Sequence, residues 1–262
     1  MPLPLVTHDQ VVDCLRAVGL QAGDGLLVHS AVQFLGRPEG GIGMYLQALW
    51  EVIGSKGTIA VPTFNFAFAH GAAYDPQHTP SQGMGSFSEY VRCAPGALRS
   101  THPMQSLAVL GRWADDLAGR DTPTAFEPGS AFARMFELDF RLLLLGADVR
   151  AVSVTHISEQ RYQVPYRYWK DFTGPVHTLC GVEQRTYRMF VRRLDLDPQL
   201  HADHVQVLLE QRGQWQAVPL HYGRVSACKV VDYVAAVDEM IAADPWALVL
   251  NPPREAQPGD GQ

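Results

Sequence analysis

The sequence predicts an α/β fold in which helices flank a layered sheet. Three observations support this. Helix-period segments alternate with short apolar runs over most of the chain, strand-like patterns follow at about 174–222, and one long helical segment comes near the end. Such an alternation is typical of a sheet covered by helices. We therefore expect a single domain over residues 1–250, followed by a polar, proline-rich and disordered tail at 251–262.

The elements of the first half have clear boundary signals. Thr7 is predicted to be a helix N-cap, because Gln10 stands at the position that completes a capping box. Gly19 ends that helix, and Pro62 ends a later strand. The predicted elements are helices at 8–19 and 42–53 and buried strands at 26–29 and 58–62. Residues 65–85 are rich in Gly, Pro, His and aromatic residues, and a loop of this length is typically functional or mobile.

The second half continues the alternation. Its clearest buried strand is RLLLLGA, at 141–147, and the residues after it predict the start of a helix. The remaining predictions are helices at 86–95, 129–139 and 225–244 and a strand at 105–111. In open α/β sheets, ligands bind beyond the carboxyl ends of the strands, so the residues that follow each strand are the first candidates for a site.

The composition excludes several classes of protein. Apolar residues make up 47% of the 262 residues, as in a globular protein, and a net charge of -6 without any basic run argues against a nucleic-acid surface. The first ten residues lack the features of a signal peptide, and no apolar stretch is long enough to span a membrane. Four scattered cysteines without a CxxC pair indicate reduced core thiols: Cys14, Cys93, Cys180 and Cys228. We expect a cytoplasmic protein without nucleic-acid or membrane partners.

A histidine and a glutamate follow the strand at 141–147. His156 and Glu159 are three residues apart, so on a helix they lie on one face. An imidazole titrates near neutral pH and suits a general base, and a nearby carboxylate fixes its tautomer. The alternative is a helix-start histidine satisfied by the backbone, with Glu159 as a solvated acid near the positive end of the helix dipole. These two residues alone leave both interpretations open.

A zinc site is a further alternative. The HxxE spacing is not the HExxH pattern of zinc peptidases, and no cysteine or second histidine is close in sequence. Three distant histidines, His177, His201 and His204, are the candidates to approach His156 in space. We therefore expect no metal.

The segment RSTHPMQS, at 99–106, has residues that suit an anion. Its polar side chains are Arg99, Ser100, His102 and Ser106. A basic side chain with hydroxyls and free amides in a turn can hold phosphate oxygens. The alternative is a proline-containing loop that its own serines cap.

The segment VHSAVQFLG, at 28–36, is a second candidate for anion binding. A strand runs directly into Ser30 and Ala31, whose small side chains let an anion approach the backbone amides. Other nucleotide-binding and hydrolase motifs are absent from the sequence: GxGxxG, Walker A and GxSxG. RPEGGIG, at 37–43, departs from the acetyl-CoA loop of the common N-acetyltransferase fold, because Ile42 takes the place of a small residue.

Five segments, in this order along the chain, resemble the aminoglycoside 3-N-acetyltransferase family. They are GDGLLVHSAVQFLG, GTIAVPTFNF, the stretch that ends in RSTHPMQS, GSAFARMFELDFRLLLLGADVRAVSVTHISE and YGRVSACKVVDYVAAVDEMIAADPWALVL. The resemblance covers about residues 7–250. It implies the layered mixed sheet of that family, flanked by helices, and not the common N-acetyltransferase fold. It also implies an antibiotic-resistance type of enzyme that transfers an acetyl group from acetyl-CoA to an amine of an amino sugar in a ternary complex.

The resemblance implies roles for particular residues. His156 would be the general base, Asp195 or else Asp197 the acid that orients it, and Glu159 a secondary or amine-binding carboxylate. Backbone amides near residues 30–32 would be oxyanion donors. The residues that the resemblance assigns to acetyl-CoA are Ser30, Ala31, Val32, Arg99, Ser100, His102 and Ser106.

The acceptor side departs from what a polycationic drug requires. Asp75 is the only acid between residues 64 and 85, and Arg167 and Lys170 follow the expected base. Positive charge repels a polycation and attracts an anion. We therefore expect an amino sugar that carries phosphate or carboxylate, such as a nucleotide-linked precursor of surface polysaccharide. The residues expected near the substrate are Asp75, Thr155 and Arg167.

Other interpretations remain open at this point. Arg167 and Lys170 are also compatible with ordinary surface charges. The scaffold is compatible with a non-catalytic protein that binds CoA or a sugar, and less so with a zinc-dependent hydrolase. A homodimer agrees with the base rate for oligomers.

Overall fold

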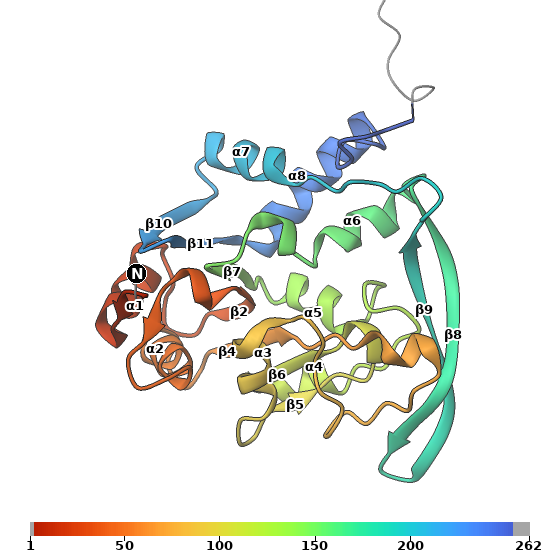
Figure 1. The fold of residues 1–262 in the computed structure, drawn as a ribbon, viewed down its shortest axis with the longest axis horizontal. Helices are drawn as coiled ribbons and strands as arrows, with labels where there is room; N and C mark the ends of the chain where they lie inside the picture. Colours follow the sequence, from red (N-terminus) through yellow and green to blue (C-terminus); the bar gives the residue numbers. More distant parts are fainter. Residues whose placement is uncertain (1–2, 254–262) are drawn as a thin grey trace, which may run out of the picture.

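The computed structural model describes residues 3–253, and a mixed sheet lies at the centre of this range (Figure 1). Its strands are β2 (Gly25–Ser30), β4 (Thr58–Pro62), β5 (Leu98–Arg99), β6 (Leu107–Gly111), β7 (Arg141–Leu145), β10 (Gln216–Leu220) and β11 (Gly223–Lys229). They pair in the order β10-β11-β7-β2-β4-β6-β5. β2 runs parallel to β4 and β7, and the other pairs are antiparallel. The expected layered mixed sheet is confirmed.

Helices cover both faces of this sheet. They are α1 (His8–Ala17), α2 (Gly43–Ile53), α3 (Gly85–Arg92), α4 (Ala114–Ala118), α5 (Ala131–Glu137), α6 (Thr155–Arg161), α7 (Asp203–Gln211) and α8 (Val230–Ala243). α1, α2 and α3 contribute to one apolar cluster, and α4 to α8 contribute to a second. None of the helices in residues 3–253 combines the length and the apolar character that crossing a bilayer needs.

The position of β7 between two helical layers explains why Leu142–Leu145 are all apolar. Successive side chains of a strand point to opposite faces of the sheet. Leu142 and Leu144 belong to one cluster, and Leu143 and Leu145 belong to the other. All four side chains are buried. A strand between two helical layers therefore needs apolar residues at every position.

A long two-stranded ribbon stands apart from the central sheet. β8 (Arg167–Thr178) and β9 (Gly181–Arg192) are antiparallel, and they run along the right side of the molecule in Figure 1. A small apolar cluster joins the ribbon to the segments before α3 and β6: Phe68, Tyr74, Met104, Val176 and Tyr187. A shorter parallel pair, β1 (Leu5–Val6) and β3 (Arg37–Pro38), lies near the N-terminus.

Some predicted elements differ from the structure. The region expected to be strand-like, at about 174–222, begins earlier, at Arg167, and contains helix α7. Residues 225–229, predicted as the start of the last helix, belong to β11 and pair with both β7 and β10. An apolar run this short does not distinguish a buried strand from a buried helix. Of the tail predicted to be disordered, residues 254–262 lie outside the described residues.

Candidate active site

His156 lies near the carboxyl edge of the sheet. After β7 the chain makes a 3₁₀ turn at Val149–Ala151 and then enters α6, whose second residue is His156. α6 packs against α8 on the sheet face that carries the larger cluster. This edge is where ligands bind in open α/β sheets, as the sequence predicts.

The His156 ring is held by a buried carboxylate and a buried guanidinium. Nδ1 of His156 lies 2.5 Å from Oε2 of Glu159, and Oε1 of Glu159 lies 2.9 Å from Nε of Arg167. The side chain of Glu159 is 1% exposed and that of Arg167 is 7% exposed, whereas His156 is 30% exposed. Arg167 also donates to the carbonyl of Phe190, at 3.1 Å. Glu159 therefore holds one ring nitrogen, and Arg167 holds Glu159.

His156, Glu159 and Arg167 form a triad, and their charges determine which of the three side chains carry a proton at neutral pH. Burial by itself would raise the pKa of Glu159, but His156 and Arg167 outweigh it and bring that pKa to about 2. Burial lowers the pKa of His156, and the Glu159 carboxylate offsets part of that effect. At neutral pH the carboxylate is therefore ionised and the imidazole is in its basic form. Such a ring can accept a proton.

The other nitrogen of the ring, Nε2, is available to bind a substrate. Nε2 of His156 has no hydrogen-bond partner among residues 3–253, and the ring lines a cavity of about 160 Å³. The edge of the ring contacts Phe126, with centroids 5.5 Å apart. Thr155 lines the same cavity, and its hydroxyl lies 2.9 Å from that of Tyr233.

The end of β2 and the start of α3 leave a polar position open at Ser30. The Ser30 hydroxyl is buried without a hydrogen-bond partner in the described chain. Beside it, Gly85 begins α3 with a positive φ of 85°, and a Cβ there would lie 3.1 Å from the Ser30 carbonyl oxygen. Met84, the residue before this helix, lines the His156 cavity. An unpartnered hydroxyl and a side-chain-free helix start leave room for a polar chain or an anion.

One of the amides expected near the oxyanion is already occupied. The N–H of Ala31 donates to the carbonyl of Leu145 at 2.9 Å, because Ala31 continues the pairing of β2 with β7. Val32 begins a 3₁₀ turn, and its N–H has no backbone acceptor in the described residues. Of these two amides, that of Val32 is therefore the remaining candidate donor.

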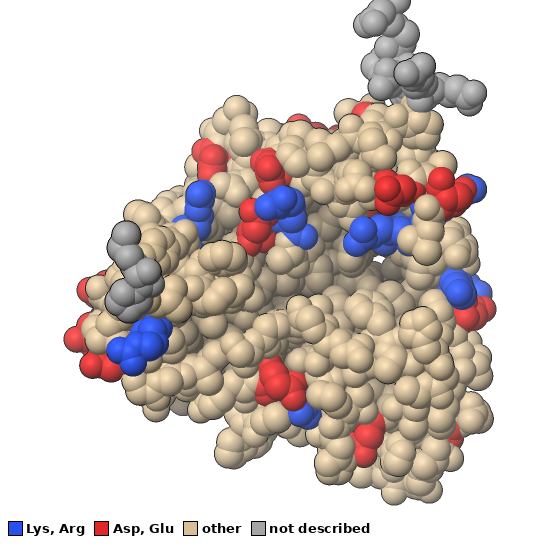
Figure 2. Space-filling view, viewed as in Figure 1, with Lys and Arg blue, Asp and Glu red and all other residues tan. Residues whose placement is uncertain are grey.

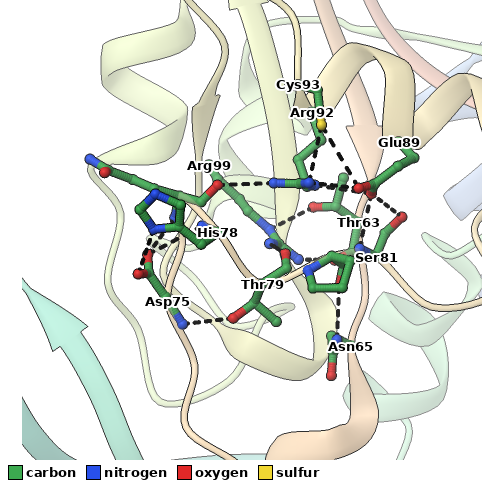
Figure 3. A network of polar contacts seen from close by, with 12 residues as sticks. Thr63, Asn65, Asp75, His78, Thr79, Ser81, Glu89, Arg92, Cys93 and Arg99 are labelled. Atoms are coloured by element: carbon green, nitrogen blue, oxygen red, sulfur yellow. Dashed lines mark hydrogen bonds and ion pairs between the residues drawn. The ribbon is translucent and has the colours of Figure 1, made fainter.

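The structure uses Arg99 as an internal crosslink rather than as an open anion site (Figure 3). Its Nε lies 3.1 Å from the hydroxyl of Thr63 and 3.0 Å from that of Ser106, and its terminal nitrogens donate to the carbonyls of Thr63 and Thr79. These bonds use one N–H on each of its three nitrogens and hold the side chain in an internal network, so a role of Arg99 toward CoA phosphate stays a prediction.

The neighbours of Arg99 in the sequence are also internally paired. The Ser100 hydroxyl accepts the N–H of Leu107 at 2.9 Å, and the Ser106 hydroxyl donates to Thr63 at 2.8 Å. His102 caps the next turn by accepting the N–H of Gln105, and burial lowers the pKa of its ring to about 4. A neutral His102 adds no positive charge to this segment. The alternative of a proline-containing loop with internal caps describes 99–106 better.

Three expected carboxylates lie away from His156. Asp195 is exposed and pairs with Arg193 at 3.2 Å, so Glu159 and not Asp195 orients the ring in this structure. Asp197 is also exposed, at a positive φ of 40° before Pro198. Asp75 lies 2.7 Å from the ring of His78, beside the Arg99 network in Figure 3, and does not line the His156 cavity. Asp75 is therefore not placed as a substrate contact.

The basic residues expected to select the acceptor have different positions. Arg167 is buried and neutralised by Glu159, so it is not a surface charge facing the acceptor. Lys170 is exposed on β8, over the ring of Phe172. Arg192, which sequence reasoning missed, is exposed, lines the His156 cavity and has no ion-pair partner within residues 3–253. No local pattern in the sequence marks Arg192, because only the ribbon brings it to the cavity.

None of the histidines proposed as zinc ligands is paired with His156 in the described chain, although His201 lines the same cavity. His177 lies on the ribbon, 3.9 Å from Asp75, whereas His201 and His204 pair with each other at 2.8 Å. Within residues 3–253, no three side chains of His, Cys, Asp or Glu are placed to hold a metal ion.

A hollow opens between the helices above the sheet and the lower strands (Figure 2). Basic and acidic side chains stand next to each other along its upper rim, and its lower wall is mostly uncharged. The acids of an adjoining groove, behind Phe126, are Glu127, whose Oε2 lies 3.2 Å from the Thr124 hydroxyl, and Glu137, which is paired with Arg134. This surface is not strongly acidic.

Comparison with known proteins identifies relatives. A family model described as aminoglycoside 3-N-acetyltransferase matches residues 27–242. Aminoglycoside N(3)-acetyltransferase VIII of Streptomyces fradiae is 30% identical over 259 residues, covering 91% of this chain and 82% of that protein. Aminoglycoside N(3)-acetyltransferase III of Salmonella sp is 29% identical over 188 residues, covering 65% of this chain and 66% of that protein, just under two thirds of its length.

Solved structures share the fold. A binary complex of AAC-IIIb with CoASH has a TM-score of 0.81 at 22% identity, covering 95% of this chain and 100% of that one. AAC(3)-Xa has a TM-score of 0.81 at 25% identity, with 90% and 93% covered, and AAC-VIa bound to sisomicin has 0.80 at 21%, with 92% and 98% covered. The family model and the Streptomyces relative together establish that this chain belongs to the aminoglycoside 3-N-acetyltransferase family.

Proposed function

We propose that the chain transfers an acetyl group from acetyl-CoA to an amine of an amino sugar, with His156 as the general base. The observation that carries this proposal is the His156 ring, which Glu159 holds at Nδ1 and which presents an unpartnered Nε2 to a cavity. Family membership supports the reaction class.

The triad supports direct transfer. Acetyl-CoA supplies a thioester carbonyl, and Ser30, the Val32 amide and the Gly85 helix start are the residues that would hold its arm. Nε2 of His156 removes a proton from the acceptor nitrogen, which then forms the N–C bond while the C–S bond breaks. The released thiolate takes up one proton, so the net products are an amide and CoA thiol. Glu159 stabilises the imidazolium that forms meanwhile.

Replacement of the base tests the proposal. His156→Asn should lower kcat by about 10²–10⁴-fold, because proton transfer loses its acceptor, while the Kd of CoA stays within about twofold. Thiol release from acetyl-CoA with a library of amines and calorimetric titration with CoA measure the two quantities. Equal losses of turnover and CoA affinity would give His156 a structural role, and a wild type that binds CoA without any turnover would favour a non-catalytic binding protein.

We propose further that the acceptor carries an anionic group, phosphate or carboxylate, beside its amine. Arg192 supports this, because it is exposed at the His156 cavity without an acidic partner in the described chain. The charge at Glu159 is already neutralised by Arg167. The second candidate is an aminoglycoside, which the names of the relatives favour, as does the carboxylate of Glu127, which accepts a hydrogen bond from Thr124 but has no ion-pair partner in the described chain.

Turnover of a nucleotide-linked amino sugar and of gentamicin-like polyamines should be compared directly. Arg192→Gln should raise the KM of the anionic acceptor about tenfold, whereas Arg193→Gln, the neighbouring arginine that pairs with Asp195, should leave it unchanged. Turnover of the polycation alone would refute the anionic acceptor. Weaker CoA binding in Arg192→Gln, with an unchanged acceptor KM, would assign Arg192 to the coenzyme instead.

A further inference from the structure

Besides His156, a second histidine lines the cavity, and this one is buried between β2 and the turn before α6. His29 is the penultimate residue of β2, with 5% of its surface exposed, and it directly precedes Ser30. Its ring lines the same cavity as His156. The proposed reaction assigns no step to this ring.

Hydrogen bonds connect His29 to His156 through one residue. The backbone N–H of Ser153 donates to Nε2 of His29 at 3.0 Å, and the Ser153 hydroxyl lies 3.0 Å from the same nitrogen. The carbonyl of Ser153 accepts the backbone N–H of His156 at 3.1 Å. Beyond the His29 ring, this path from β2 to the first turn of α6 therefore runs through backbone groups alone.

The bonds of His29 fix its tautomer and charge. A backbone N–H can only donate, so Nε2 of His29 is the acceptor nitrogen and Nδ1 carries the proton. Burial, with a smaller effect of His156, lowers the pKa of His29 to about 3, and the ring is neutral at neutral pH. A neutral ring adds no positive charge next to His156 when that residue takes up a proton.

We propose that His29 is a positioning residue of the transfer site: it fixes Ser153 and thereby sets His156 relative to Ser30 on β2. This inference rests on the proposed acetyl transfer, because Ser30 belongs to the coenzyme side and His156 to the acceptor side. Without the acceptor nitrogen, the Ser153 N–H is left buried and unpaired, and the turn before α6 loses its connection to β2.

Matched variants distinguish the loss of the hydrogen bond to Ser153 from a general loss of packing at His29. His29→Gln places an amide oxygen near the position of Nε2 and should keep the bond to Ser153. His29→Leu removes the acceptor, and His29→Asn, whose side chain is too short to reach Ser153, repeats the loss with a polar residue. Ser130→Ala is the control, because the buried Ser130 hydroxyl also caps a helix, α5, by accepting the N–H of Ala133 at a distance from the cavity.

The first measurement does not depend on turnover. NMR titration of His156 should give a pKa nearer its ordinary value in His29→Leu and His29→Asn, because a loosened turn lets the ring reach water. The titration in His29→Gln and Ser130→Ala should match the wild type. If neither His29→Leu nor His29→Asn alters the titration of His156, the inference is wrong, whatever the activity.

The second measurement is kinetic. In His29→Leu and His29→Asn, kcat should fall about 10–100-fold, because small displacements of a base are costly, while the Kd of CoA stays within about twofold. His29→Gln should recover most of the rate. Parallel losses of kcat and of CoA affinity, or a folded His29→Gln as slow as His29→Leu, would leave His29 only a structural role. If the wild type transfers no acetyl group, the proposed function fails, and the titration still decides the role of His29.

Discussion

The properties of His156 depend on a residue three positions away and on another eleven positions away. Glu159 shares a helical face with His156, so their contact was one of the interpretations that the sequence left open. Arg167 reaches Glu159 only because the chain turns back between the end of α6 and the first residue of β8. The sequence therefore placed the two residues on one helical face but assigned Arg167 to the acceptor and favoured Asp195 as the acid that orients His156. Both errors concern contacts that depend on tertiary structure.

The pH dependence of kcat follows from this pair. The base must be unprotonated, and burial lowers its pKa below 6.5, so kcat should be constant through neutral pH and fall about tenfold per unit below the lowered pKa. In Glu159→Gln the carboxylate that raises the pKa of His156 is gone, so the acidic limb should move to still lower pH. Steady-state kinetics between pH 4 and 8 measure this. An acidic limb above pH 7, or one unmoved in Glu159→Gln, contradicts the assignment.

Removal of Arg167 should affect stability as well as activity. Arg167→Gln leaves the buried Glu159 carboxylate without its cation, and the free energy of unfolding should fall by about 3 kcal/mol. Urea denaturation at pH 7 measures the change. Arg193→Gln, in which an exposed ion pair is lost, serves as the control and should change stability by less than about 1 kcal/mol.

At the scale of elements, the boundary signals were the most reliable part of the sequence. Thr7 and Gln10 form the predicted capping box, and Pro62 ends β4 as expected. The role of segment 99–106 was harder to predict, because the same residue types occur in phosphate sites and in internal hydrogen-bond networks. What decides between them is where the donors of Arg99 point, and this depends on Thr63 and Thr79, which are far away in the sequence.

The Arg99 network should therefore support folding rather than coenzyme binding. Arg99→Met leaves the carbonyl of Thr79 without its donor and removes one of the two donors to the carbonyl of Thr63, and it should cost about 2–3 kcal/mol of unfolding free energy, with the Kd of CoA within about twofold. Arg112→Met is the control, since Arg112 is exposed and mainly contacts the ring of Trp113, at 4.7 Å. A large loss of CoA affinity in a stable Arg99→Met would restore the phosphate assignment.

At the scale of the whole molecule, one sheet joins two apolar layers, so we propose that residues 1–250 unfold as one unit. The sequence predicted this sheet because four consecutive leucines of β7, Leu142–Leu145, are buried, but it missed the switch from strand to helix at Lys229, because the residues on both sides of it are mainly apolar. The order of the strands was also beyond reach, since pairing partners such as β7 and β2 are more than a hundred residues apart.

The two layers should respond alike to denaturant. Leu49→Ala on α2 and Leu209→Ala on α7 remove fully buried side chains from opposite layers, and each should cost about 2–5 kcal/mol. Tryptophan fluorescence and far-ultraviolet circular dichroism should give coincident urea transitions in both variants. Separate transitions, with one layer unfolding first, would indicate two domains.

The ribbon of β8 and β9 is secured at two separate places. Arg167 ties its base to Glu159, and the cluster of Val176 and Tyr187 with Phe68 ties its outer half to the rest of the molecule. Between Thr178 and Gly181, the turn exposes Leu179 completely. Substitutions in this turn should therefore leave the contacts among His156, Glu159 and Arg167 unchanged. Insertions at this tip should also be tolerated, since its backbone is held by few contacts outside the ribbon.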